Sequence, residues 1–273
     1  YAKINLALNV TGKSSRLHKI ESIVSFIDLH DLIYLSLINK KNHKVSFQGK
    51  FSEGIGKKNT ISVLLKLLDQ KKLLNNKKFK INVVKNIPQQ AGMGGGSMNA
   101  SSLINFLINK KIIKIKRNKL AKLSKLVGSD VILGINPSSC ILSSNGEITK
   151  YTKKLKLHTL IVKPNFGCST KYIFSKVKYF SKSKFSLPKQ TMLDINYLKN
   201  LNNDLEAIAF KKHPKLKIIK LFLETFPNTI FVRMSGSGSS IVAYFHSKRA
   251  CSIAIKQFKR KFKSHWRITS KTI

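Results

Sequence analysis

Acidic residues are scarce in this chain. Only 11 Asp and Glu stand against 52 Lys and Arg among 273 residues, which gives a formal net charge of +41. Arginine is also rare, with six residues, and the lysines are spread evenly without interleaved aromatic residues. This distribution argues against a specific nucleic-acid interface. Because lysine, isoleucine and asparagine are all abundant and share A/T-rich codons, we interpret the charge as compositional bias. We expect any nucleic acid to bind non-specifically and to be released by salt.

Cysteine and long apolar runs are scarce as well. The three cysteines, Cys140, Cys168 and Cys251, have neither paired nor metal-ligand spacing. Together with the absence of a signal peptide, this predicts a reducing cytoplasm. No apolar run reaches the length of a transmembrane helix, so no membrane partner is expected. With 42% hydrophobic residues, the chain can build the core of one large domain or two moderate ones.

Glycine is uncommon too, yet four of the 14 glycines lie within residues 92–96. A strand-like run at 79–87 precedes them, and apolar residues at helical spacing follow over 97–110. Glycines let the backbone approach an anion closely, and the positive end of a helix dipole adds attraction. The arrangement therefore predicts a phosphate-binding loop. The alternative is a plain surface turn followed by a helix that Ser97 caps.

The glycine loop differs from the common nucleotide-binding motifs. No Lys follows the glycines, which excludes a Walker A loop. A dinucleotide fingerprint that starts at Gly92 would need a glycine where Ser97 stands. The H-R-D and D-F-G motifs of protein kinases are absent. The loop therefore indicates nucleotide phosphate chemistry of another class.

Two more segments complete a pattern with this loop. The chain opens with A-K-I-N at residues 2–5, reads P-Q-Q-A-G-M-G-G-G-S at 88–97, and has S-G-S-G at 235–238. In this order the three segments resemble the GHMP kinase superfamily, whose members phosphorylate small-molecule alcohols with ATP. The order and distances are harder to match by chance than any one segment.

A closer resemblance, from residue 1 to about 245, is to the 4-diphosphocytidyl-2-C-methyl-D-erythritol kinase family. It rests on L-H-K-I-E-S at 17–22, followed by Phe26 and Asp31, and on G-S-D-V at 128–131. Further segments fall in the family's order: N-T-I at 59–61, Lys85, G-E at 146–147, S-T at 169–170 and N-D-L-E at 203–206. The chain departs from the family at four positions: Leu17, Met98, Ile132 and Lys171. The family usually has at the first of these a Tyr that stacks on cytosine, so the change puts the nucleobase pocket in doubt.

The resemblance implies an α+β fold with two domains, 1–150 and 151–273. The N-terminal half would resemble a ribosomal-protein fold, the C-terminal half would be ferredoxin-like, and the active site would lie in the cleft between them. Hydrophobic patterns predict strands at 1–10, 32–48, 79–87, 139–151 (with a hairpin turn at Asn145-Gly146), 157–163, 229–234 and 240–246. They predict helices at 60–72, 97–110, 118–127, 170–179, 193–211, 214–226 and 248–260. The Lys-rich connector 175–190 is expected to be a mobile surface segment.

Phosphoryl transfer needs positioning, charge neutralisation and help with the hydroxyl proton. The resemblance makes Asp130 the proton acceptor and Lys3 the cation that keeps it ionised. Without the resemblance, the two would read as a helix-terminal surface Asp and a solvated Lys. The residues implied to bind ATP are Asn59, Lys85, Pro88, Gly92, Gly94, Gly95, Gly96 and Ser97. Those implied to bind the alcohol substrate are Asn5, His18, Thr170, Gly236, Ser237 and Gly238.

Each assignment has a plainer alternative. Lys85 could be a solvated lysine and Asn59 an ordinary helix N-cap, while Gly236 and Gly238 could simply form a tight hairpin. ATP and Mg²⁺ are the expected cofactors, and Ser97 is the one side chain considered as a metal ligand.

Three functions stay open at this point. The first is the cytidyl-diphosphate alcohol kinase, acting as a monomer or weak dimer on its small-molecule substrate. The second is another GHMP kinase, acting on homoserine or a mevalonate-type alcohol, for which Leu17 leaves room. The third is a non-enzymatic basic RNA-binding protein, since half of the superfamily fold resembles a ribosomal protein. The presence of Lys3, Asp130 and the glycine loop together argues against the third.

Overall fold

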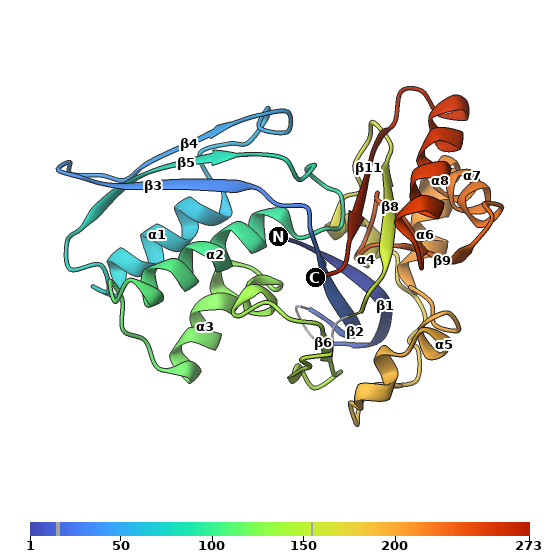
Figure 1. Ribbon diagram of the computed structural model, residues 1–273. Coiled ribbons are helices and arrows are strands. Elements are labelled where there is room, and N and C mark those ends of the chain that lie inside the picture. The colour runs from blue at the N-terminus through green and yellow to red at the C-terminus, as the bar shows by residue number, and fades with distance from the viewer. Residues whose placement is uncertain (15–16, 154) are drawn as a thin grey trace. The chain divides into compact units, whose positions relative to one another are not determined.

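A computed structural model describes residues 1–14, 17–153 and 155–273 (Figure 1). The chain forms two compact units. The first unit contains Tyr1–Ala2, Leu29–Gln89 and Gly94–Pro137, and the second contains Lys3–Asp28, Gln90–Met93 and Ser138–Ile273. Each unit is thus assembled from separate stretches of sequence. The domain division expected at residue 150 stays a prediction.

The first unit packs helices on one face of a three-stranded sheet (Figure 1). Its elements are β3 (Leu32–Ile38), β4 (Lys44–Gln48), α1 (Thr60–Gln70), β5 (Lys78–Val84), α2 (Gly95–Asn109), α3 (Arg117–Val127) and a 3-10 turn, η1 (Val131–Gly134). The strand order is β3-β5-β4, with β3 antiparallel and β4 parallel to the central β5. Leu64 of α1, Ile81 of β5 and Ile104 of α2 are fully buried in one apolar core. The glycine loop follows the central strand, at the start of the helix that covers it.

The second unit contains two four-stranded sheets, ordered β1-β2-β6-β7 and β11-β8-β10-β9. Its strands are β1 (Ala2–Lys13), β2 (His18–Ile27), β6 (Cys140–Leu142), β7 (Ile148–Lys150), β8 (His158–Lys163), β9 (Thr229–Met234), β10 (Ile241–Phe245) and β11 (Trp266–Lys271). Its helices are α4 (Thr170–Ser175), α5 (Ile195–Leu198), α6 (Leu205–Lys212), α7 (Pro214–Glu224) and α8 (Lys248–Lys261), with a 3-10 turn, η2 (Gln190–Leu193). α6, α7 and α8 bury their apolar side chains against the second sheet.

Most elements expected from the sequence are confirmed within a few residues at their ends, including the hairpin β6–β7. The single strand expected at 32–48 is wrong, because β3 and β4 are two strands separated by a turn. The helix expected at 170–179 ends at Ser175. Two strands, β2 and β11, were not expected from the sequence. The α+β character of the chain is confirmed.

The long helix expected at 193–211 is also wrong. The chain breaks between α5 and α6, where residues 202–204 pair with β1. The amide of Leu8 donates to the carbonyl of Asn202 at 3.1 Å, and the amide of Asp204 donates to the carbonyl of Leu8 at 2.9 Å. These long-range backbone bonds override the local helical pattern, since a helix there would leave the edge of β1 unpaired.

The connector 175–190 is not simply a surface segment. Phe185 is fully buried, and the equally buried carboxylate of Glu21 accepts three hydrogen bonds from this stretch. The donors are the Ser183 hydroxyl at 2.7 Å and the amides of Lys184 and Phe185 at 2.6 and 3.1 Å. Asn9 donates to the same carboxylate at 2.8 Å. A buried carboxylate needs such donors, so Glu21 fixes the connector to the first sheet of its unit.

All three cysteines are buried and free, as their spacing in the sequence indicated. Burial raises the pKa of Cys140 to about 11, so this thiol stays protonated and unreactive at neutral pH. Over the described residues, the helices include none with both the length and the hydropathy to cross a bilayer.

Candidate active site

The glycine loop ends at the first turn of α2, in the first unit. Gly94 has a φ of 65°, in the left-handed region, and is the residue that caps α2. Its lack of a side chain leaves no side-chain acceptor for the N–H groups of the first turn. The prediction that Ser97 caps this helix is wrong, because the helix begins at Gly95 and Ser97 is its third residue. A helix start with a glycine backbone and no side-chain cap is a suitable phosphate site.

Asp31 anchors the chain that leads into this loop. Its side chain is fully buried and forms an ion pair with Lys85, which is 5% exposed. Its other carboxylate oxygen accepts the amides of Asn86 and Ile87 at 2.7 and 2.8 Å. Asn99 of α2 donates to the first oxygen at 2.9 Å. One carboxylate therefore joins the end of β5 to the first turns of α2.

This arrangement rules out the plainer alternative for Lys85, because the lysine is buried and paired instead of solvated. Sequence reasoning used Asp31 only as a family match and missed its positioning role. The scarcity of carboxylates was the signal, since each of only 11 acids in so basic a chain needs a reason. Pro88, two residues before Gln90, is also buried.

The other residues of the loop pack tightly. A Cβ on Gly95 would lie 3.1 Å from a methyl carbon of Ile87 and 3.3 Å from the Lys85 ammonium. The Gly96 carbonyl accepts the hydroxyl of Thr60 at 2.8 Å. This bond ties α2 to the start of α1, where Asn59 accepts the Ser62 amide at 3.0 Å in a capping box. The N-cap interpretation of Asn59 is confirmed, and its contact with ATP stays a prediction.

Asp130 lies in the short segment between α3 and η1, and this segment is fastened to α2. The hydroxyl of Ser101 donates to the carbonyl of Val131 at 2.6 Å, and Asn105 donates to the carbonyl of Gly134 at 3.0 Å. Asp130 is half-buried and accepts a long hydrogen bond of 3.4 Å from Ser129. The same helix thus has the glycine loop at its start and holds the Asp130 segment along its middle.

In the second unit, Lys3 is a buried lysine on β1. It is 4% exposed, and its ammonium donates to the side-chain oxygen of Asn5 at 2.7 Å. The side-chain nitrogen of Asn5 donates in turn to the Ser22 hydroxyl on β2 at 2.8 Å. The interpretation of Lys3 as one more solvated lysine is therefore wrong. Burying an ammonium is costly, so its placement here indicates a role.

The opening strand, the glycine loop and the late S-G-S-G segment meet within the second unit. The Ser235 hydroxyl donates to the carbonyl of Gly92 at 2.9 Å. It accepts a hydrogen bond from the backbone N–H of Asn5 at 3.3 Å. Asn203 donates to the carbonyls of Met234 and Gly236, both at 2.8 Å. Three motifs far apart in sequence are thus one hydrogen-bonded structure. Sequence reasoning placed neither Ser235 nor Asn203 in the site.

Thr170 and Ser237 also come together, with their hydroxyls 2.9 Å apart. Gly236 and Gly238 have φ values of 53° and 87° in the turn between β9 and β10, which pair antiparallel. The hairpin interpretation of these glycines is confirmed, and their contact with substrate phosphates stays a prediction. Four of the substrate residues predicted from the sequence therefore lie in the second unit at two adjoining places. Thr170 is at the start of α4, and Gly236, Ser237 and Gly238 are in the β9–β10 turn.

His18 lies beside two aromatic rings. Its ring centroid is 5.2 Å from that of Phe174 in α4 and 6.4 Å from that of Phe180. Burial, with a smaller effect of Lys13, lowers the pKa of His18, so the ring is neutral at physiological pH. Leu17 next to it is 71% exposed. The two phenylalanines were missed from the sequence, although they are the flat apolar surfaces nearest to this histidine.

Lys3 and Asp130 belong to different units, so their pairing stays a prediction, as does a cleft between the halves. The first unit contains Gly94, Gly95, Gly96 and Asp130, and the second contains Lys3, Asn5 and Gly92.

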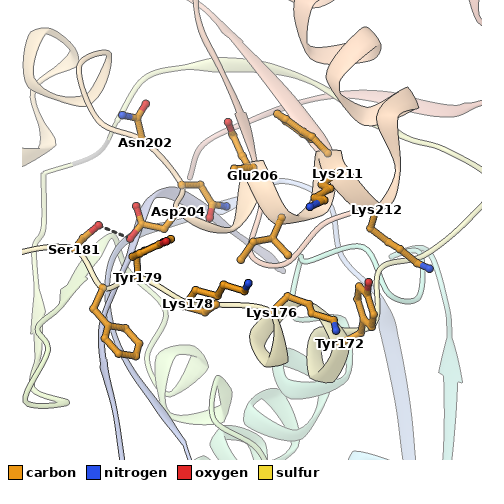
Figure 2. Close-up of a pocket in the computed structure, with 16 residues that line it drawn as sticks. Tyr172, Lys176, Lys178, Tyr179, Ser181, Asn202, Asp204, Glu206, Lys211 and Lys212 are labelled. Carbon is orange, nitrogen blue, oxygen red and sulfur yellow. Dashed lines mark hydrogen bonds between the residues drawn. The ribbon is translucent and has the colours of Figure 1, made fainter.

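A pocket of about 1140 Å³ lies between α4 and α6 in the second unit (Figure 2). Two of its described lining residues contact the residues discussed above, because Asn203 bonds to Gly236 and Phe180 lies beside His18. The described lining includes none of the site residues predicted from the sequence.

The packing at Gly92 leads to a prediction about stability. This residue has a φ of 71°, and a Cβ on it would lie 1.9 Å from the carbonyl oxygen of Ser235. Gly146 also has a positive φ, 87°, but a Cβ there would meet nothing within 4 Å. Gly146→Ala should therefore cost about 1 kcal/mol of unfolding free energy from backbone strain alone. Gly92→Ala should cost about 3 kcal/mol or more.

Urea denaturation of the two glycine variants measures this difference. Equal losses in both would show that the motifs do not pack through Gly92.

Comparisons with known proteins show the family to which the chain belongs. Residues 59–143 match the model for the GHMP kinases N terminal domain. The curated 4-diphosphocytidyl-2-C-methyl-D-erythritol kinase of Pelagibacter ubique (strain HTCC1062) is 66% identical over 273 residues, covering 100% of this chain and 97% of the relative. The kinase of the same name from Clostridium kluyveri (strain ATCC 8527) is 31% identical over 274 residues, covering 96% of this chain and 95% of the relative.

Solved structures share the fold. A crystal structure of 4-(cytidine 5'-diphospho)-2C-methyl-D-erythritol kinase superposes with a TM-score of 0.77 at 22% identity, covering 99% of this chain and 97% of that one. Homoserine kinase from Cytophaga hutchinsonii superposes with a TM-score of 0.70 at 16% identity, covering 100% and 94%. Fold and matched domain together define the class as a GHMP kinase. Within that class, the chain belongs to the 4-diphosphocytidyl-2-C-methyl-D-erythritol kinase family.

Proposed function

We propose that the protein transfers the γ-phosphoryl group of ATP to the 2-hydroxyl of 4-diphosphocytidyl-2-C-methyl-D-erythritol, in non-mevalonate isoprenoid precursor synthesis. The observation that carries this proposal is the 66% identity to the Pelagibacter ubique kinase along the whole chain. Three features of the structure support the proposal, because phosphoryl transfer depends on positioning and on stabilising charge. They are the buried Lys3, the glycine start of α2 without a side-chain cap, and the Asp130 segment that Ser101 holds to α2.

In this proposal Asp130 accepts the proton of the attacking hydroxyl. Lys3 keeps that carboxylate ionised and eases the charge that develops on the hydroxyl oxygen. The bond from Lys3 to Asn5 supports the role of Lys3, because it fixes the direction of a side chain that would otherwise rotate freely. Asn5 in turn is held by Ser22, so the ammonium is positioned by two further side chains.

The first turn of α2 would hold the ATP phosphates. Gly94, Gly95 and Gly96 present backbone N–H groups there, and Gly92 shapes the approach to the turn. The remaining residues proposed on the ATP side are Asn59, Lys85, Pro88 and Ser97. In this proposal Lys85 contacts ATP and also stabilises the chain before the loop, because its ammonium is paired with Asp31.

The residues present fit a magnesium ion held mainly by phosphates and water. Over the part of the chain that the structure describes, His, Cys, Asp and Glu form no group of three or more suited to a metal. Mg²⁺ commonly keeps several waters and takes few protein ligands when it binds with ATP. We propose Ser97, in the first turn of α2, as the side chain nearest to such an ion. When bound, the ion would neutralise charge on the transferred phosphates.

The alcohol substrate would lie against the residues of the second unit that surround Lys3 and Asn5. Asn5, Thr170 and the turn Gly236-Ser237-Gly238 are proposed to face its phosphates and hydroxyls. The bond between Thr170 and Ser237 supports this, as do the bonds that fix Asn5 to Ser235 and Gly236 to Asn203. His18 would face the nucleobase, with Phe174 as the adjacent flat surface. The rings beside His18 support a pocket for a flat heterocycle even though Leu17 offers no ring.

A coupled assay of ADP release tests the assignment. The purified protein, with Mg²⁺ and ATP, should release ADP fastest with 4-diphosphocytidyl-2-C-methyl-D-erythritol among a panel that includes homoserine and mevalonate. The expected preference in kcat/KM is at least about 10⁴-fold, because pocket groups left unpaired by the smaller alcohols discriminate strongly. Faster release with homoserine or mevalonate would assign the chain to the second function kept open above.

The remaining proposals concern the surroundings of the enzyme. We propose a cytoplasmic monomer or weak dimer with domains 1–150 and 151–273 and no specific nucleic-acid partner. The even spread of lysine supports the last point, because sequence-selective binding needs base-reading or stacking groups gathered on one face.

A further inference from the structure

A second cavity, of about 860 Å³, lies in the first unit between the end of α1 and α3. Its lining divides into two kinds of side chain. The apolar floor consists of Leu73, Ile115, Leu123 and Leu126. The cationic rim consists of Lys71, Lys114, Lys116, Lys119 and Lys122. No acidic side chain lines the cavity among the described residues.

The apolar floor runs from the core of the unit to its surface. Leu123 is 1% exposed and belongs to the buried core, and Leu73 and Ile115 pack against that core while partly exposed. Leu126, one turn further along α3, is 61% exposed. The floor is therefore a continuous apolar strip that an alkyl chain could cover, and covering it would remove apolar surface from water.

The cationic rim is rich in lysine, although the cavity lined by Lys40 and Lys41 is equally so, with four lysines among its six described lining residues. The apolar floor beside the rim is what distinguishes this cavity. Lysine makes up 46 of 273 residues, about one in six, but five of the nine residues that line this cavity. The larger pocket of Figure 2 has four lysines among 16 lining residues and also contains Asp204 and Glu206. All five rim lysines are exposed, and none takes part in a salt bridge recorded for the described residues.

The two kinds of lining require two kinds of chemistry in one ligand. An inorganic anion would pair with the rim and leave the floor exposed to water, whereas a neutral hydrocarbon would cover the floor and leave the ammonium groups unpaired. Lysine stems can lie along apolar surface with the charge at the edge, which suits a ligand with an apolar body and a charged end. The cavity also has the size of a small-molecule site.

We propose that this cavity binds a soluble amphipathic anion, an alkyl chain that carries a phosphate or diphosphate head group. The alkyl chain lies on the apolar floor and the head group on the cationic rim. The site is separate from the proposed ATP site within the same unit, because α1 starts at the capping residue Asn59 and ends beside Lys71. Its 11 residues separate the two ends by about 16 Å.

Calorimetric titration of the full chain with alkyl phosphates of increasing length, each below its micelle-forming concentration, tests the proposal. The association constant should rise about two- to fourfold for each added methylene until the floor is covered, and inorganic phosphate should bind far more weakly. Lys119→Glu/Lys122→Glu should lower the affinity for octyl phosphate at least about tenfold. Leu126→Asn should flatten the dependence on chain length while leaving the affinity for short chains within about twofold.

A matched control separates this site from the general positive field. Lys40 and Lys41 line another lysine-rich cavity, whose only apolar lining residue among those described is Ile38. Lys40→Glu/Lys41→Glu makes the same change in net charge and should leave octyl phosphate binding within about twofold at 0.15 M salt. Thermal unfolding of every variant checks that it is folded.

Three results would overturn the proposal. The first is equal loss of binding in both double variants, which would show a non-specific effect of charge. The second is an association constant that does not depend on chain length. The third is binding to anionic phospholipid vesicles without binding to monomeric alkyl phosphate, which would make the strip a membrane contact.

Discussion

Asp130→Asn is expected to lower kcat by about 10²–10⁴-fold, the usual contribution of a general base. The affinity for ATP should change less than about threefold, because the proposed role of Asp130 concerns the acceptor hydroxyl and not the nucleotide. Asparagine has the same shape and can still accept the hydrogen bond from Ser129, so the segment fastened to α2 should stay folded. Steady-state kinetics with both substrates, and thermal unfolding of the variant, measure these effects.

A second substitution and a control sharpen the test. Lys3→Met should also lower kcat strongly, since it removes the buried ammonium held by Asn5. Asp194→Asn changes another carboxylate, which is 47% exposed and paired with Lys153 at 2.5 Å, and should leave kcat unchanged. Near-normal turnover in Asp130→Asn would contradict the base assignment and leave a mechanism of positioning and charge neutralisation alone.

Asp31→Asn is expected to cost about 3–5 kcal/mol of unfolding free energy, because it leaves the buried Lys85 ammonium without its counter-charge. The amides of Asn86 and Ile87 would also lose a charged acceptor. Since these contacts set the path into the glycine loop, KM for ATP should rise as well. Urea denaturation and ATP-dependent kinetics measure the two effects.

Two comparisons identify the cause of that loss. Asp69 pairs with Lys78 at 2.7 Å, but its side chain is 30% exposed. Asp69→Asn should therefore cost about 1 kcal/mol or less. The double variant Asp31→Asn/Lys85→Met removes the stranded charge and should recover much of the stability. If the double variant were less stable than Asp31→Asn, the buried ion pair would not be the source of the effect.

The sequence predicted the parts of the site that depend on local chain properties. The glycine loop could be located because glycines between a strand and a helix are a local pattern. The start of α2 was still misplaced, since Gly94 in the left-handed region caps it instead of Ser97. The strand β2 was missed because buried polar residues such as Glu21 and Ser22 interrupt its apolar pattern. The break before α6 was missed because its cause, pairing with Leu8, is about 195 residues away in sequence.

The sequence by itself determined the class of this protein. Three of its features can be recognised without knowing which residues meet in the fold. They are the ordered motifs, the scarce carboxylates and the apolar periodicity. Only the tertiary structure decided which charges are buried and what holds them. Lys3 and Lys85 are two lysines among 46, and although the resemblance singled them out, nothing in the neighbouring sequence showed that they are buried. Asn5 and Asp31 distinguish them, because an ammonium leaves water only where the folded chain supplies an acceptor in its place.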